Sequence, residues 1–565
     1  MFENLSGDAL RLEQADSLCL DLPDAAWELM TLTGDWARER SVVHRPLCEG
    51  FQGVESLRGA SSLTASPFAA LLRPGTTEQR GEVIASALVY SGNFRAGAEV
   101  DSRGMTRLRL GLNARQFSWN LNPGEVFQTP EAVLVYSAEG LSGMSAQFHA
   151  LCRDHLVRGK YAHAPRPILL NNWEATYFDF NEDKLLQIAR KAADAGVELF
   201  VLDDGWFGHR DSDNSSLGDW VVDQNKLPHG LRHLVDEVHA MGLRFGLWFE
   251  PEMVSPDSDL YRAHPDWALH IDGRTPIESR NQLTLDLSRQ DVCDYIYRSV
   301  SGILRENGID YVKWDMNRNF SNIGSACLSP SAMRELPHRY MLGLYGILER
   351  LQEEFPDVLF ESCASGGGRF DLGMLHYMPQ TWCSDNTDAL CRCRIQWGTS
   401  MVFPPFAMGS HVSAVPNHQT GRITPLSTRV NVAMSACFGF ELDLNRLTDQ
   451  EIEEVRAAIR RIKNLRMLLL YGRFHRLLSP FEGHDTSWIT VSKDQRKAVL
   501  MFTRDLRQAN TDHPIVRLAG LDPDVRYLIE ETGEIYGGDQ LMASGLCIAL
   551  PSGDAASVSL VLSAQ

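Results

Sequence analysis

The alternation of apolar and polar residues divides the chain into three regions. Up to about residue 150, and again over residues 475–565, short alternating segments such as MTRLRLGLN and SWITVS are separated by Gly, Pro and Asn. Alternation bounded by turn residues predicts antiparallel β-strands. Between about 165 and 470, continuous apolar runs alternate with stretches of helical periodicity. Buried strands between helices predict a parallel sheet covered by helices.

Eight strand-like runs can be counted in the central region. In order they are ILLNNW, VELFVLDDGW, LRFGLWFEPE, LTLDLS, IDYVKWDMNR, VLFESCASGG, QTWCSDNTD and FPPFAMGSH. Eight repeats in roughly 300 residues are typical of a (β/α)8 barrel. A doubly wound sheet would need a Gly-rich turn after its first strand, and NNWEATYF contains no glycine. We therefore predict an α/β fold with a (β/α)8 (TIM) barrel over 156–472, an N-terminal β-sandwich over 1–155 and a small C-terminal antiparallel β-domain over 473–565.

The carboxyl ends of the predicted barrel strands, where the chemistry lies in this fold, collect carboxylates, tryptophans and basic residues. In chain order these are Trp173, Glu174, Asp203, Asp204, Trp248, Glu250, Glu252, Arg280, Asp286, Lys313, Asp315, Asn317, Arg318, Cys363, Ser365, Trp382, Asp385, Asp388 and His411. Sugar hydroxyls need charged partners, and the apolar face of a sugar stacks on aromatic rings. Two carboxylates on opposite walls can break a glycosidic bond. The rim thus indicates a carbohydrate site, with Asp315 and Asp385 expected on strands five and seven.

Each of these features also has a simpler structural interpretation. Asp315 beside Lys313 could be a structural ion pair. Asp203 and Asp204 could form a helix N-cap, or a metal site, because hard cations take paired carboxylates. Strand-end tryptophans are often core lids, and the triple glycine 366–368 could be only a flexible turn. It is the joint occurrence on one rim that favours a catalytic pocket.

Composition narrows the class of protein. The formal charge of −19 argues against nucleic acid or an anionic membrane as the main partner. The 11 cysteines show no CxxC…CxxC spacing and no HExxH is present, so free thiols in a reducing compartment are expected and a structural zinc site is not. The N-terminus lacks a signal-peptide pattern, and no run reaches the ~18 apolar residues of a membrane span. We expect a cytoplasmic protein without a metal or other cofactor.

Several stretches closely resemble bacterial α-galactosidases of glycoside hydrolase family 36. They are RGASSLTASPFAAL at 58–71, VLDDGWFG at 201–208, GDWVVDQNKLPHGL at 218–231, GLWFEPEMVSPDS at 246–258, YVKWDMNR at 311–318, FESCASGGGRFD at 360–371, WCSDNTD at 382–388 and VPNHQTGRITPL at 415–426. The similarity covers nearly the whole chain, and YVKWDMNR together with WCSDNTD is highly specific. It implies the same three-domain architecture.

The resemblance also implies roles for particular residues. Asp315 would be the nucleophile and Asp385 the general acid/base of a retaining α-galactosidase, which releases terminal α-D-galactose from melibiose or raffinose by double displacement. Lys313 would keep Asp315 ionised, and the surroundings of Asp385 would raise its pKa so that it starts protonated. The implied sugar contacts are Trp173, Asp203, Asp204, Trp248, Arg280, Lys313, Asn317, Cys363 and Ser365. Cys363 and Ser365 would face the 2-hydroxyl.

Other functions remain open at this point. An α-N-acetylgalactosaminidase is the nearest, although a thiol at Cys363 leaves little room for an acetamido group. An α-galactosyl transferase would use similar chemistry. A non-catalytic carbohydrate-binding protein would lack Asp315 or Asp385, and both are present. A metal-dependent hydrolase would rest on Asp203 and Asp204 with the glutamates after strand three.

The N-terminal region departs from the family pattern. Typical bacterial members begin earlier, with further sandwich strands, so MFENLSGDALRLEQADS enters that domain midway. In longer relatives these domains help build the oligomer, and a neighbour's N-terminal segment can close the pocket. We expect a homo-oligomer, with tetramer formation and the aglycone side of the pocket both in doubt.

Overall fold

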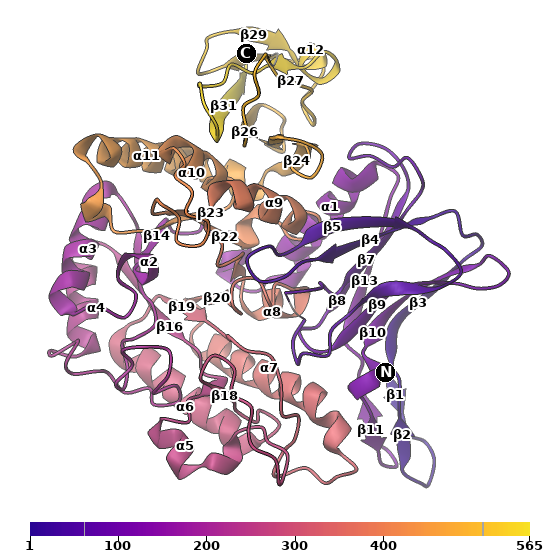
Figure 1. Cartoon of the computed structure of the whole chain (residues 1–565). Helices are drawn as coiled ribbons and strands as arrows, with labels where there is room; N and C mark the ends of the chain where they lie inside the picture. Colours follow the sequence, from indigo (N-terminus) through magenta and orange to yellow (C-terminus); the bar gives the residue numbers. More distant parts are fainter. Residues whose placement is uncertain (62, 511–512) are drawn as a thin grey trace.

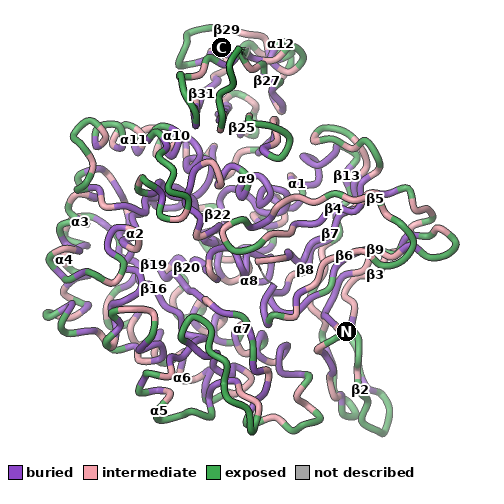
Figure 2. The backbone as a smooth tube through the Cα atoms, viewed as in Figure 1, coloured by how far each residue is buried: buried purple, intermediate pink, exposed green. Residues whose placement is uncertain are grey.

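The structure, a computed structural model, describes residues 1–61, 63–510 and 513–565, and its centre is a closed barrel of eight parallel strands (Figure 1). The barrel strands are β14 (Leu169–Asn171), β15 (Leu199–Leu202), β16 (Arg244–Phe249), β19 (Tyr311–Trp314), β20 (Leu359–Ser362), β21 (Gln380–Trp382), β22 (Met408–Ser413) and β23 (Cys437–Glu441). Nearly every residue in them is buried, as Figure 2 shows at the centre of the molecule. The predicted (β/α)8 barrel is confirmed.

One predicted barrel strand is wrong. LTLDLS, expected as strand four, contributes only β18 (Leu283–Thr284), which pairs with β17 (Met253–Val254) in a separate antiparallel hairpin. The missing strand is β23, from the run CFGFE, which closes the barrel between β22 and β14. LTLDLS alternates apolar and polar residues as hairpin strands do, whereas a parallel barrel strand is apolar on both faces. Asp315 and Asp385 therefore follow the fourth and sixth barrel strands rather than the fifth and seventh.

A helix follows each barrel strand on the outside of the barrel (Figure 1). These helices are α3 (Glu182–Ala195), α4 (Leu231–Ala240), α6 (Gln290–Asn307), α7 (Leu336–Glu354), α8 (Leu372–Tyr377), α9 (Ala389–Thr399), α10 (Leu426–Ala433) and α11 (Asp449–Tyr471). Local signals set their ends: α3 begins where the Asn181 side chain accepts the backbone N–H of Lys184, and it stops at Gly196, whose φ of 96° suits glycine. Among the described residues, none of the helices combines the length and apolar composition needed to cross a membrane.

Domains built mainly of antiparallel β-strands flank the barrel on two sides, as predicted (Figure 1). The N-terminal one has a four-stranded sheet of β3 (Asp16–Leu22), β10 (Thr106–Leu112), β9 (Phe94–Val100) and β6 (Gly50–Glu55), and a five-stranded sheet of β13 (Glu131–Ser137), β8 (Val83–Val89), β7 (Phe68–Leu72), β4 (Glu28–Thr33) and β5 (Ser41–Pro46). The C-terminal sheet contains β24 (Arg473–Leu478), β25 (Asp485–Val491), β26 (Lys497–Arg504), β31 (Ala556–Ala564), β28 (Arg526–Ile529) and β29 (Ile535–Gly537). Shorter elements are β1 (Phe2–Glu3), β2 (Leu10–Leu12), β11 (Trp119–Leu121), β12 (Val126–Phe127), α1 (Gly140–Leu151), α2 (Trp173–Thr176), α5 (Asp259–Ala263), β27 (Ile515–Val516), α12 (Gly538–Ala543) and β30 (Leu546–Cys547).

The turn between β4 and β5 docks the N-terminal domain onto the barrel. The buried guanidinium of Arg40 donates hydrogen bonds to the carbonyls of Gly367 (3.0 Å) and Cys383 (2.5 Å) and to the hydroxyl of Thr399 (2.6 Å). A Cβ on Gly367 would lie 2.4 Å from Arg40 Nη2, so only glycine permits this approach. The triple glycine is therefore a docking surface and not only a flexible turn.

A fully buried ion pair joins the segments that follow β16 and β20. Glu252 accepts hydrogen bonds from both terminal nitrogens of Arg369, at 2.7 and 3.0 Å, and neither side chain is exposed to solvent. The Trp314 indole (2.8 Å) and the Tyr340 hydroxyl (2.7 Å) donate to the same carboxylate. Glu252, one of the rim carboxylates, is thus fully occupied by structural partners.

Replacing Arg369 by methionine is expected to destabilise the fold by about 3–5 kcal/mol, because it leaves the Glu252 carboxylate buried without its cation. The measurement is the urea midpoint of unfolding followed by tryptophan fluorescence. A double variant, Glu252→Gln with Arg369→Met, should recover most of the loss. Arg107→Ala, which removes an exposed ion pair with Asp21, is the control and should leave the midpoint nearly unchanged. A wild-type midpoint in Arg369→Met would contradict this account.

Candidate active site

A pocket of about 620 Å³ lies at the carboxyl ends of the barrel strands. All of the residues predicted as catalytic or sugar-binding line it. They are Trp173, Asp203, Asp204, Trp248, Arg280, Lys313, Asp315, Asn317, Cys363, Ser365 and Asp385. A second cavity of about 520 Å³ lies where α1 approaches β24, and Glu139 is the one acidic side chain among the residues that line it. Of these two cavities among the described residues, the barrel pocket is the one that carries the paired carboxylates that the sequence analysis emphasised.

Asp315, directly after β19, is held by three N–H donors. Its Oδ2 accepts from the Trp248 indole at 3.2 Å and from the Asn317 amide at 2.8 Å, while Oδ1 accepts from the backbone of Met316 at 2.8 Å. Asn317 is itself fixed, because its backbone N–H donates to Glu250 and its side-chain oxygen accepts from Ser365. The carboxylate of Asp315 therefore has one defined orientation at the pocket wall.

Lys313 bonds to a different carboxylate from the one expected. Its Nζ lies 2.8 Å from Asp203 Oδ2, and Asn171 donates to the same oxygen at 2.6 Å. Burial opposes the charge on Lys313, but the combined attraction of the acidic groups around it, of which Asp203 is the strongest, outweighs burial and holds the pKa of Lys313 well above its usual value. Asp315 contributes to that attraction only as a weaker neighbour. Lys313 therefore acts on Asp315 at longer range and not through a direct contact.

Asp204 forms a two-point ion pair with Arg210. The Nε of Arg210 lies 2.5 Å from Oδ1 and its Nη2 lies 2.8 Å from Oδ2, with both side chains buried. Burial raises the pKa of Asp204, and Arg210 opposes this effect. The N-cap interpretation of Asp203 and Asp204 is wrong, because the next helix, α4, begins only at Leu231. Each carboxylate instead has its own cationic side chain.

Asp385, after β21, receives a hydrogen bond that the sequence did not predict. The indole N–H of Trp36, in the turn between β4 and β5, donates to its Oδ2 at 2.9 Å. Burial raises the pKa of Asp385; the Trp36 bond lowers it, and the negative charge of Asp315 raises it further. The Asp385 side chain is partly exposed to the pocket. Burial by the surrounding protein is nevertheless the largest effect, so the net shift of the pKa of Asp385 is upward. The predicted direction of this pKa shift is confirmed.

Two further residues were missed by the sequence analysis. Trp36 lies 349 positions before Asp385, and a tryptophan in a β-turn of another domain carries no barrel signal. Glu441 ends β23 and lines the pocket. Its signal was present, since CFGFE is an apolar run that ends in an acid. Burial raises the pKa of Glu441 well above its usual value, and His411 lies 3.1 Å from its Oε1.

Comparisons with known proteins agree with this architecture. Three family models match the chain: Glycosyl hydrolase family 36 N-terminal domain over residues 1–122, Melibiase over 126–472, and Glycosyl hydrolase family 36 C-terminal domain over 485–562. The chain belongs to glycoside hydrolase family 36. The resemblance drawn from the sequence motifs is therefore confirmed.

Family 36 relatives match over nearly the full chain. α-Galactosidase AgaA of Geobacillus stearothermophilus is 54% identical over 553 residues, which cover 98% of this chain and 76% of that one. α-Galactosidase Mel36A of Lactobacillus acidophilus is 47% identical, with 98% and 75% covered. The crystal structure of AgaA superposes with a TM-score of 0.99 over 100% of this chain and 78% of that one. A variant of AgaA, with the same TM-score and coverage and 52% identity, was solved in complex with raffinose.

Asp385→Asn is expected to become progressively more stable than the wild type as the pH rises. A raised pKa means that the folded state holds the Asp385 proton more tightly than the unfolded state, so stability from this group falls between the ordinary value, about 3.9, and the raised one. Asparagine has no proton to lose. The difference in Tm between variant and wild type, measured from pH 4 to 8, should grow and then level off.

The exposed Asp179 supplies the matched control for this experiment. Asp179→Asn should follow the wild type at every pH. A Tm difference for Asp385→Asn that does not change with pH would show that its surroundings do not raise the pKa of Asp385.

Proposed function

We propose that this chain is a retaining α-galactosidase that hydrolyses terminal, non-reducing α-D-galactose residues from oligosaccharides such as melibiose and raffinose. Two findings support the substrate class. The family 36 relatives are named α-galactosidases, and the AgaA variant that binds raffinose shares the fold over the whole of this chain. The pocket also combines carboxylates, cations and indoles, which are suited to hydroxyl groups and to the apolar face of a sugar.

The observation that carries the proposal is that Asp315 and Asp385 share one pocket in different environments. Asp315 is fixed by three N–H donors, as an attacking carboxylate needs to be. Asp385 has a raised pKa, to which the charge of Asp315 contributes. A carboxyl group with a raised pKa that shares a pocket with a carboxylate held in place by N–H donors has the properties of an acid beside a nucleophile.

The reaction follows from these two states. Asp385 gives its proton to the glycosidic oxygen while Asp315 forms a bond to the anomeric carbon, and the bond to the leaving group breaks. The product of this step is a covalent galactosyl-enzyme. Asp385, now ionised, takes a proton from water, and the water oxygen displaces Asp315 from the anomeric carbon. Two displacements at the same carbon give galactose with its original configuration.

The remaining pocket residues are proposed to bind the sugar. Asp203 and Asp204, each kept in place by a cation, would accept hydrogen bonds from galactose hydroxyls, and Lys313 would donate one. Arg280, Asn317 and Ser365 lie on the wall near Asp315, while Trp173 and Trp248 offer aromatic surface. Each galactose hydroxyl that forms hydrogen bonds with two pocket side chains increases the selectivity for galactose over an epimer that lacks a hydroxyl at that position in that orientation.

Cys363 is proposed to select against a 2-acetamido group. Its thiol is buried at the pocket wall, and burial, with Asp315 beside it, raises the pKa of Cys363 well above its usual value. The thiol is therefore protonated and compact, and it leaves room for a hydroxyl rather than an acetamido group. This residue distinguishes the proposed activity from that of an α-N-acetylgalactosaminidase.

The first test compares p-nitrophenyl α-D-galactopyranoside with its 2-acetamido counterpart, with and without EDTA. We expect rapid release from the galactoside, at least about 100-fold slower release from the acetamido sugar, and no effect of EDTA at room temperature. The absence of an EDTA effect follows because side chains supply every group in the reaction. Release only from the acetamido sugar would refute the specificity proposed for Cys363, and loss of activity in EDTA with an unchanged Tm would refute the metal-independent mechanism.

Asp315→Ala is expected to lower kcat by at least about 10⁴-fold while leaving the fold intact, because it removes the carboxylate that attacks the anomeric carbon. Added azide should partly restore turnover by entering the vacated space, and the product should be β-galactosyl azide, identified by NMR. In Asp385→Ala, azide should instead attack the galactosyl-enzyme and give the α-azide. The same anomer from both variants would contradict the assigned roles.

A further inference from the structure

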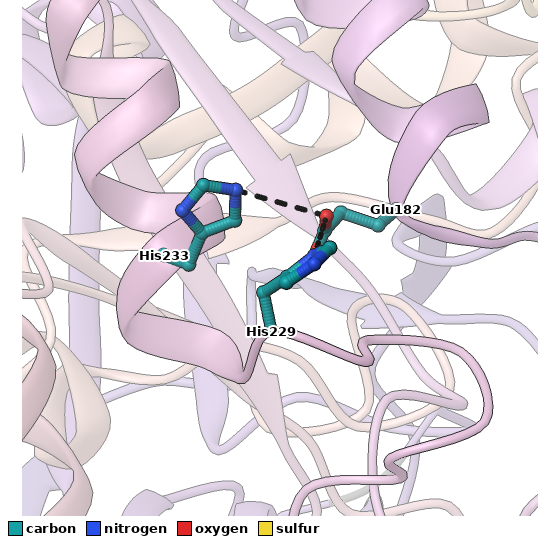
Figure 3. Close-up of side chains that lie close together, drawn as sticks. All are labelled: Glu182, His229 and His233. Atoms are coloured by element: carbon teal, nitrogen blue, oxygen red, sulfur yellow. Dashed lines mark hydrogen bonds and ion pairs between the residues drawn. The ribbon is translucent and has the colours of Figure 1, made fainter.

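Glu182, His229 and His233 come together where α3 and α4 begin, away from the catalytic pocket. Glu182 is the first residue of α3, His229 precedes the cap of α4, and His233 lies in its first turn. Figure 3 shows both imidazole rings directed at the carboxylate. One potential ligand atom from each residue lies within 4.8 Å of the others. Within the part of the chain that the structure describes, no other three such side chains are arranged this way.

Ordinary hydrogen bonding does not account for this cluster. His229 Nδ1 lies 2.8 Å from Glu182 Oε1, but His233 Nε2 is 3.8 Å from the same oxygen, which is too far for a hydrogen bond. Glu182 is 6% exposed, and its second oxygen, Oε2, is buried without a hydrogen-bond partner. A buried carboxylate oxygen without a partner costs free energy. The helix N-terminus explains a negative charge here, but it explains neither the two imidazoles at Oε1 nor the unsatisfied Oε2.

We propose that Glu182, His229 and His233 form a binding site for a divalent transition-metal ion of the zinc class. Imidazole nitrogen and carboxylate oxygen are the ligands that Zn²⁺ prefers, and three protein ligands leave the fourth tetrahedral position to water. Bonds of 2.0–2.2 Å place tetrahedral ligand atoms about 3.3 Å apart. The present spacing therefore closes by small side-chain rotations, which the exposed imidazoles are free to make. His229 and His233 have a His-x3-His spacing that zinc sites use, but the third ligand, Glu182, lies 47 positions before His229, so the complete site does not show in the sequence.

The bound ion would fasten the segment between β15 and α4 to α3. This segment starts with Asp203 and Asp204 in the pocket and ends beside His229. Next to the cluster, the backbone N–H of Glu182 donates to the carbonyl of Lys226 at 2.9 Å. The Lys226 ammonium then donates to the carbonyls of Gly205 and Arg210, both at 2.9 Å. A metal here would therefore stabilise the scaffold of the pocket without entering it.

The test uses the full chain, stripped of metal with EDTA and then freed of the chelator. Isothermal titration calorimetry with ZnCl₂ should show one tight equivalent, and Zn²⁺ should raise the Tm. In His233→Ala and in Glu182→Gln the Kd should increase by at least about tenfold, and the rise in Tm should disappear. His233 is exposed, so its replacement tests the site without threatening the fold.

His239→Ala is the matched control. His239 lies on the same helix as His233, and its Nε2 is 2.9 Å from Asp310, but among the described residues no second imidazole joins that pair to form a three-ligand group. It should bind Zn²⁺ as the wild type does, and any binding to exposed cysteines will be equal in all variants. Equal affinity in wild type and His233→Ala would overturn the proposal, as would an equal loss in His239→Ala. Hydrolysis of the galactoside is measured in a separate assay. If the chain does not hydrolyse it, the Zn²⁺ titration still tests the metal site.

Discussion

The completed pocket depends on one buried guanidinium, that of Arg40. It extends from the N-terminal domain and donates to the backbone carbonyls of Gly367 and Cys383, after β20 and β21, so these buried acceptors are paired across the domain boundary. The same turn is fixed a second time, where the Ser384 hydroxyl donates to Glu39 at 2.6 Å. Because this turn is held so closely, Trp36 reaches Asp385. The barrel supplies both carboxylates, but the neighbouring domain completes the environment of one of them.

The pocket concentrates acidic side chains and differentiates them through their partners. Asp203 and Asp204 are each matched by a cation, Lys313 and Arg210. Asp385 and Glu441 have no direct cationic partner of this kind in the described structure, and burial raises the pKa of both. The same residue type can thus serve as a charged ligand for hydroxyls or as a proton carrier. What decides between these roles is the local balance of desolvation and opposite charge.

Much of the architecture could be read from the sequence, because it depends on local patterns. Apolar runs between helical segments identified seven barrel strands, and strand-end side chains identified the pocket residues, since the carboxyl ends of parallel strands meet on one rim. The exception is instructive. LTLDLS and CFGFE are both short and strand-like, and an apolar count does not say which of them is covered by helices on both faces. Only closure of the barrel placed β23, and with it Glu441, in the site.

Contiguous motifs and the period of the apolar residues were enough to identify the family, the barrel and most of the acids and indoles at its mouth, with Trp36 and Glu441 as the exceptions. Tertiary structure decided the partners. In the folded chain Lys313 pairs with Asp203, and Trp36 donates a hydrogen bond to Asp385, which lies 349 positions later in the sequence. It also placed two histidines of one segment against Glu182 of another. Hydrogen bonds and charge interactions act over a few ångströms in space, and distance along the chain does not report them.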